Sequence, residues 1–194
     1  MSTTANSPTP SEDDYVIPMS SHASRREDGQ STMPEKRKAS PCVISESSVG
    51  TELDEAECQV LAQIMGVQTL QDSEVLVTEG AADNSLFILA SGRLAVANGV
   101  GDKETVVYLM SPGECAGTRA FVDRTGRKAT LRAMGNVTVY ALQPEAFEAL
   151  LKTHALLVYK VMRALFRITH GNLMRMNMES RELTNYITRS RGRY

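Results

Sequence analysis

Short β-prone runs separated by turn signals are the feature that most constrains the fold of this chain. The runs lie at residues 75–77, 86–89, 94–96, 105–109 and 137–140. The dipeptides between them are typical of tight turns: Glu79-Gly80, Ser91-Gly92, Asn98-Gly99, Pro112-Gly113 and Gly135-Asn136. Strands at this close spacing predict an antiparallel roll, barrel or sandwich.

Helical patterns flank the β-prone region on both sides. Before it, apolar residues recur at three- and four-residue steps over 53–65, which predicts an amphipathic helix that Gly66 stops. After Pro144 and Glu145 the pattern stays helical to about residue 188 without a proline. Its apolar stripe comprises Leu157, Val161, Leu165 and Ile168, with Met174, Met178, Leu183 and Ile187 further along. A thirty-residue helix is about 45 Å long and outreaches a small roll, so we expect some of this stripe to need another partner.

The first fifty residues differ in composition from the rest of the chain. They are rich in Ser, Thr, Pro, Asp and Glu and poor in large apolar residues, so they offer too little surface to bury against the entropy of ordering. The sequence therefore predicts a disordered tail at 1–50, a β-roll at 51–153, and a long C-terminal helix with a basic tip at 154–194. Within the tail, residues 36–40 (KRKAS) fit either a basophilic kinase site or a solvated charge cluster.

The charge balance and the cysteines limit the location and the partners. The 194 residues include 21 basic and 23 acidic ones, which gives no basic excess for nucleic acid or an acidic membrane. No apolar run is long enough to span a bilayer, and a secretory signal is absent. Three widely spaced cysteines without a CxxC pair fit a reduced compartment. We therefore expect a cytoplasmic protein.

Catalytic signatures are missing from the sequence. His22, His154 and His170 show neither HxH nor HExxH spacing, and there is no nucleophile elbow or Walker loop. We therefore expect no catalytic residues, no metal site and no bound cofactor. The chain is expected to work by binding and association.

Residues 72–96 (DSEVLVTEGAADNSLFILASGRLAV) carry a specific resemblance. They are similar to the stretch of cyclic nucleotide-binding domains in which an acidic-glycine turn, a polar loop, an aromatic-containing strand and a serine-glycine turn follow one another, with Ser73 replacing a usual glycine. The resemblance covers about residues 53–173. It implies a mainly β fold with flanking helices, a double-stranded β-helix (a jelly-roll-like β-roll) followed by a long C-terminal helix. Gly80 and Gly92 fit positions that need positive φ or a tight strand crossing.

Residues 116–130 (AGTRAFVDRTGRKAT) resemble the phosphate-binding cassette of that family. There a Gly-Glu pair opens a short helix, and an arginine follows nine or ten residues after the glutamate. In the family, helix N–H groups hold the cyclic phosphate and the arginine neutralises it. The resemblance implies a ligand site at Gly117, Thr118, Arg119, Ala120, Arg127, Lys128, Ala129 and Thr130.

Two cassette positions depart from the family pattern. Thr118 stands where the family has the glutamate that binds the ribose 2′-hydroxyl, and Glu114 lies in the preceding turn. Loss of a charged hydrogen bond costs about 1.5–3 kcal/mol, or roughly 10- to 150-fold in affinity, so we expect weak or no binding of cyclic AMP and cyclic GMP. Thr118 is expected either to cap the short helix or to fill the space that the glutamate would occupy. Arg119 adds a cation that either serves a more highly charged anion or points outward.

Two functions remain open at this stage. The first is a stand-alone sensor that binds a cyclic nucleotide or another phosphate ligand at Arg127 and signals to a separate effector through its C-terminal helix. The second is a degenerate scaffold, in which the roll only presents a dimerising C-terminal helix and a tail to partners. For Arg127 itself, the alternative to anion binding is a structural arginine that pairs with a carboxylate to hold the cassette loop. Residues 185–194 are too few for a helix-turn-helix module, so nucleic acid is not an expected partner.

Overall fold

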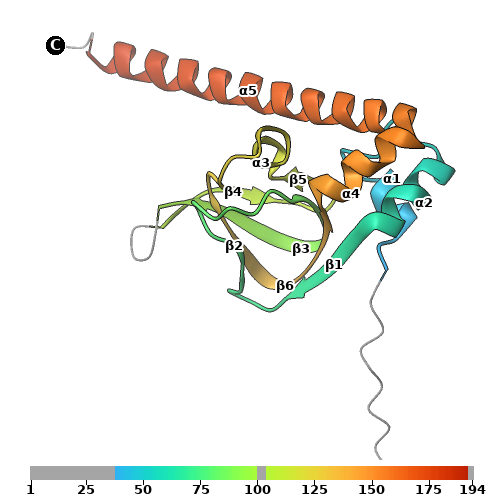
Figure 1. Cartoon of the computed structure of the whole chain (residues 1–194). Coiled ribbons are helices and arrows are strands. Elements are labelled where there is room, and N and C mark those ends of the chain that lie inside the picture. Colours follow the sequence, from blue (N-terminus) through green and yellow to red (C-terminus); the bar gives the residue numbers. More distant parts are fainter. Residues whose placement is uncertain (1–37, 100–103, 192–194) are drawn as a thin grey trace, which may run out of the picture. The chain divides into compact units, whose positions relative to one another are not determined.

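The computed structural model describes residues 38–99 and 104–191 (Figure 1). The strands are β1 (Met65–Leu70), β2 (Val75–Val77), β3 (Leu86–Asn98), β4 (Thr105–Met110), β5 (Cys115–Ala116) and β6 (Thr130–Leu142). The helices are α1 (Pro41–Ser45), α2 (Glu55–Ile64), α3 (Thr118–Asp123), α4 (Pro144–Ala149) and α5 (Ala155–Arg191), with the 3-10 turn η2 (Leu150–Lys152) before α5. Residues 1–37, including most of the predicted tail, and Arg193 of the basic tip lie outside the described residues.

All strand pairs are antiparallel, as the turn spacing predicts. The order is β1-β6-β3-β4, with β2 pairing to β6 and β5 pairing to β3. Phe87, Leu89, Val137 and Val139 meet in the core between the strands. A second core lies between the strands and the helices, and α1, α2 and α4 gather at the end where β1 begins (Figure 1). The expected β-roll with flanking helices and a long C-terminal helix is confirmed.

Two predicted turns lie inside long strands. Gly92 belongs to β3 and Gly135 to β6, and each of these strands has 13 residues. Both glycines have positive φ, 87° and 77°, and the pairing of β3 with β6 shifts register on either side of Ser91. An irregularity of this kind bends a strand and increases its twist, as a closed roll requires. The chain therefore continues through these positions instead of reversing.

The predicted disorder up to residue 50 is wrong for its last part. Residues 41–45 form α1, and Ala39, Ile44 and Val49 are buried in the core against α2. These three apolar residues are five positions apart, which matches neither a helical nor a strand period. The sequence pattern therefore did not indicate an ordered segment here. Gly66 also differs from expectation, because α2 runs directly into β1 and Gly66 pairs with Ala141.

The apolar stripe of α5 packs on its own domain. Leu157, Val161 and Leu165 are buried in the core with α1 and α2, and Ile168 is partly buried against it. These four residues thus have their partner within the chain, and the expectation that some of the stripe needs another partner now concerns its later part. A different set of α5 side chains is exposed: Leu156, Tyr159, Met162, Phe166, Leu173, Met174, Met176 and Met178.

Ion pairs hold the first half of α5 against α2 and the segment that precedes it. Lys160 pairs with Glu57 of α2 at 2.6 Å, and Arg163 and Arg167 both pair with Glu52. Together with the buried stripe they fix the start of α5. Among the described residues, no helix combines the length and the apolar character needed to cross a membrane.

Candidate anion-binding site

The cassette helix α3 begins at a glycine in the left-handed region. Gly117 is the N-cap, with φ 85°, and Thr118 is the first helical residue. The expectation that Thr118 caps the helix is therefore wrong. Ala120 and Phe121 are buried, and the Phe121 ring lies 5.5 Å from that of Phe147 in α4. This contact anchors the cassette against the helical side of the core.

Arg127 is the buried centre of the site, with 4% of its surface exposed. Its main chain bonds to the loop after β2, with Arg127 N–H donating to the Ala81 carbonyl and Gly80 N–H donating to the Arg127 carbonyl, both at 2.9 Å. Its Nη2 donates to the Ser85 carbonyl at 2.7 Å and to the Asp83 carboxylate. The guanidinium carbon lies 4.7 Å from the centre of the Phe87 ring. These contacts fix both the backbone and the side chain.

The Arg127 guanidinium leaves no room for a side chain at residue 117, so this position requires glycine. A Cβ atom at this residue would lie 2.1 Å from Nη1 of Arg127 and 2.9 Å from the Ser85 carbonyl oxygen. The residue also has a positive φ, which glycine adopts without a steric penalty. The cassette glycine and the cassette arginine are therefore fitted to each other.

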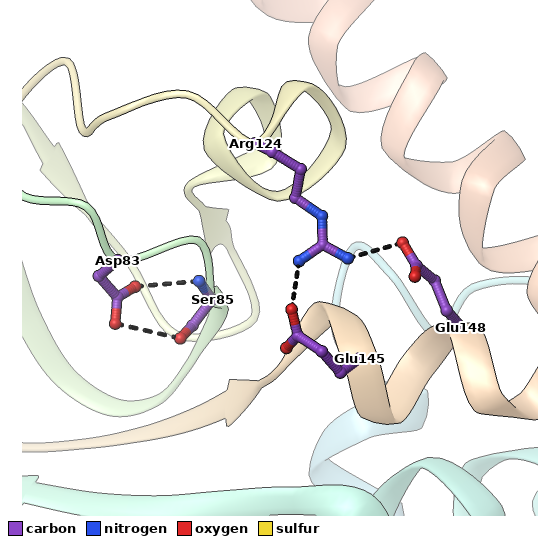
Figure 2. Close-up of polar contacts among 5 residues, drawn as sticks. All are labelled: Asp83, Ser85, Arg124, Glu145 and Glu148. Carbon is purple, nitrogen blue, oxygen red and sulfur yellow. Dashed lines mark hydrogen bonds and ion pairs between the residues drawn. The ribbon is translucent and has the colours of Figure 1, made fainter.

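Asp83 is held in a local turn that presents its carboxylate to Arg127. One carboxylate oxygen accepts from the Ser85 N–H at 2.9 Å and the other from the Ser85 hydroxyl at 3.2 Å (Figure 2). Burial favours the neutral acid, but the bonds from Ser85 and Arg127 outweigh it and hold the pKa of Asp83 below its ordinary value. The Asp-x-Ser spacing of a side-chain turn was the sequence signal for this residue.

Part of the Arg127 guanidinium is left unsatisfied. Nε and Nη1 are buried, and neither has a hydrogen-bond partner among the described residues. Buried donors without a partner are costly, and charged ones especially so. Arg127 is one of the residues that line a cavity of about 650 Å³.

The cavity gathers most of the site residues expected from the sequence. Its lining includes Gly117, Thr118, Arg119, Ala120, Arg127, Lys128 and Ala129. Thr130 is the exception: it is buried, and its hydroxyl accepts from the Glu79 N–H at 3.1 Å. It therefore joins the cassette to the loop after β2.

The far wall of the cavity was not expected from the sequence. It comes partly from α5, through Ile168, Asn172, Arg175 and Met176. The Arg175 guanidinium lies 4.7 Å from the centre of the Tyr108 ring. No local pattern marks Arg175, because its contact depends on where the helix crosses the roll.

Glu114 also lines the cavity, on the same wall. Tyr108 donates its hydroxyl to Glu114 at 2.6 Å, and this bond raises the pKa of Tyr108. The second carboxylate oxygen accepts from the Ser111 N–H at 2.8 Å. Glu114 therefore closes the turn before β5, in agreement with its placement from the sequence.

Arg124 links the cassette to α4. It ends α3 with φ 54°, and its guanidinium donates to Glu145 and Glu148, each at 2.6 Å (Figure 2). The two carboxylates raise the pKa of Arg124. The cassette thus has both an aromatic and an ionic contact with the helix that precedes α5. In the described part of the chain, no group of three or more His, Cys, Asp or Glu residues is placed to hold a metal ion.

Comparison with known proteins agrees with this geometry. Residues 67–154 match the family model of the cyclic nucleotide-binding domain. These residues belong to that family. The chain is 28% identical over 109 residues to a cGMP-dependent protein kinase of Plasmodium berghei (strain Anka), a match that covers 56% of this chain and 12% of the kinase. The chain therefore spans only a small part of that relative.

Solved cyclic nucleotide-binding domains share the fold. One from Methylobacillus flagellatus superposes with a TM-score of 0.65 at 20% identity, over 70% of this chain and 79% of that one. The regulatory domain of Toxoplasma gondii PKA, solved with cAMP, has a TM-score of 0.51 at 25% identity, over 56% of this chain and 42% of that one. These likenesses show that the chain has the fold of a cyclic nucleotide-binding domain.

Proposed function

We propose that this cyclic nucleotide-binding domain is a sensor that acts by binding, taking a phosphate-containing ligand at Arg127 and passing the signal through α5. The observation that carries the proposal is that Arg127 lines the cavity while its Nε and Nη1 donors are buried and have no partner among the described residues. A phosphate oxygen is a charged acceptor that satisfies such donors strongly. Asp83 and Ser85 engage only Nη2 of the same guanidinium.

The contacts of the cassette support α5 as the output. Phe121 and Arg124 connect α3 to α4, and α4 leads through η2 into α5. On the other side, Asn172 and Arg175 of α5 form part of the cavity wall. A ligand that enters the cavity therefore contacts the cassette and α5 together. We propose that a separate effector protein reads the resulting position of α5.

Thr118 makes cyclic AMP and cyclic GMP weak ligands in this proposal. It lines the cavity at the position where the family has its glutamate, and Glu114 is already engaged by Tyr108 and Ser111. A ribose 2′-hydroxyl would therefore lose a charged acceptor, which costs roughly tenfold or more in affinity.

A thermal-shift screen tests the proposed function. The ligands are cyclic AMP, cyclic GMP, a cyclic dinucleotide and inorganic phosphate, applied to wild type and to Arg127→Gln. Arg132→Gln is the matched control, because Arg132 pairs with Glu104 and does not line the cavity. A ligand at about 100 times its Kd stabilises the native state by about 2.7 kcal/mol. We expect at least one ligand to raise the Tm of wild type and of the control, but not of Arg127→Gln. Equal shifts in all three proteins, or none in wild type, would contradict the proposal.

The second candidate function is a dimerising scaffold. Its support is a seven-residue spacing of exposed apolar side chains on α5, at Tyr159, Phe166 and Leu173, which is the repeat of a two-stranded helical seam. Phe166 is 72% exposed. We propose a homodimer through this face, and we expect Phe166→Asp to yield monomers in sedimentation. Monomeric wild type at tens of micromolar would contradict it.

A further inference from the structure

We propose that the ligand of this site carries two phosphate groups on a nucleoside, so that a bisphosphorylated nucleotide binds better than a cyclic mononucleotide. This inference rests on the proposed function of Arg127. It concerns the class of ligand, and it follows from the charges around the cavity and from the apolar part of its wall.

Positive charge exceeds negative charge in the cavity lining. The charged lining residues among those described are Arg119, Arg127, Lys128, Arg175 and Glu114. Asp83 already compensates part of the Arg127 charge. Tyr108 and Ser111 engage the single carboxylate of the lining, Glu114. One phosphate at Arg127 would therefore leave positive charge uncompensated.

Two of these cations are available to a second phosphate. Lys128 has no acidic partner within the described residues, and it follows Arg127 directly, so their Cα atoms are about 3.8 Å apart. In the described part of the chain, the one acidic partner of Arg119 is Asp123 at 3.7 Å, and their side chains are 66% and 53% exposed. Such an exposed pair contributes little and opens readily. Arg119 lies two residues from Gly117, which borders the Arg127 guanidinium. All three cations therefore belong to the cassette end of the cavity.

Among the residues that the structure describes, the cassette end of the cavity offers no carboxylate to a sugar hydroxyl. Thr118 is neutral, and Asp83 is committed to Arg127 and Ser85. A carboxylate at residue 118 would repel a second phosphate at close range. Without a carboxylate at residue 118, a cyclic nucleotide lacks an acceptor for its 2′-hydroxyl. A bisphosphate, in contrast, avoids a repulsive negative charge.

The apolar wall of the cavity argues for a nucleoside and against a free polyphosphate. The strand residues Val77, Val96, Val107 and Leu131 also line the cavity. A volume of about 650 Å³ lies within the range of roughly 300–1,000 Å³ that is typical of small-molecule sites. A base can occupy the apolar side while two phosphates meet the cations.

Isothermal titration calorimetry on the full chain tests this inference with matched ligands. Adenosine 3′,5′-cyclic monophosphate and adenosine 3′,5′-bisphosphate share the nucleoside and the substituted positions but differ in the number of phosphates, and inorganic pyrophosphate lacks the nucleoside. We expect wild type to bind the bisphosphate at least about tenfold more tightly than the other two. Arg119→Gln with Lys128→Gln should remove the preference over the cyclic nucleotide, and Arg132→Gln should retain it. Thr118→Glu should reverse it.

The outcomes separate this inference from the proposed function. Arg127-dependent binding of the cyclic nucleotide, equal to or tighter than that of the bisphosphate, overturns the inference and leaves the function standing. A preference that survives Arg119→Gln with Lys128→Gln overturns it as well, because the cations are then not its source. Pyrophosphate binding as tight as that of the bisphosphate overturns the nucleoside part. If Arg127→Gln changes the binding of none of the three ligands, the proposed function itself fails.

Discussion

Replacing Gly117 by alanine tests the fit between the cassette glycine and the cassette arginine. The new methyl carbon would lie 2.1 Å from Nη1 of Arg127, so the guanidinium must leave its position. That movement disrupts its bonds to Asp83 and Ser85, and hydrogen bonds of charged groups contribute about 1.5–3 kcal/mol. The positive φ of 85° adds about 1–2 kcal/mol of backbone strain. We expect a loss of about 3–5 kcal/mol in the free energy of unfolding.

Gly135→Ala is the matched control for this change. Gly135 has φ 77°, but no atom lies within 4 Å of a Cβ built at this residue. The control therefore carries the backbone strain without the displaced arginine, and it should cost about 1–2 kcal/mol. Urea unfolding followed by circular dichroism measures both variants. Equal losses for Gly117→Ala and Gly135→Ala would refute the argument that Gly117 is shaped by Arg127.

The remaining predictions concern the loop contacts of the site. Arg124→Ala should be less stable than Arg124→Gly, because both variants lose the pairs with Glu145 and Glu148 but only alanine keeps the strain of φ 54°. Urea unfolding measures the free energy of unfolding of both variants, and the opposite order of stability would contradict this prediction. Asp83 has a lowered pKa, so its contribution is present above its unfolded pKa of about 3.9 and is lost as pH falls through the folded value. The stability difference between wild type and Asp83→Asn should therefore shrink from pH 7 to pH 3, and a constant difference would show that the Asp83 charge is not involved.

The strand pattern and the cassette could be predicted from the sequence because local chemistry determines them. Gly80, Gly92 and Gly117 need positive φ, and only glycine adopts it readily, so these positions leave a visible mark in the chain. Arg127 was identified through the resemblance to the family's cassette, in which an arginine follows the short helix at a fixed spacing. For Gly92 and Gly135, the predicted chain reversal was wrong, because these glycines bend β3 and β6 instead of ending them.

Features that depend on long-range packing were not visible in the sequence. The period of α5 identifies an apolar stripe, but it does not say whether Leu165 faces its own domain or a second copy. The contact of Arg175 with Tyr108 joins residues 67 positions apart and depends on the crossing of α5 over the roll. The short α1 has too few residues for any period to be detected. In each case, tertiary packing and not the local sequence determines the contacts of the residue or helix.

The central claim, that the free donors of Arg127 receive an anion, is tested most directly by the Nε–H signal of this side chain. The signal is assigned in ¹H–¹⁵N spectra by its loss in Arg127→Lys, and its burial should slow exchange with water. On titration with adenosine 3′,5′-bisphosphate, we expect the signal to shift and to saturate with the Kd obtained by calorimetry. Measurable binding of the bisphosphate that leaves the Arg127 Nε–H signal unchanged would contradict the account.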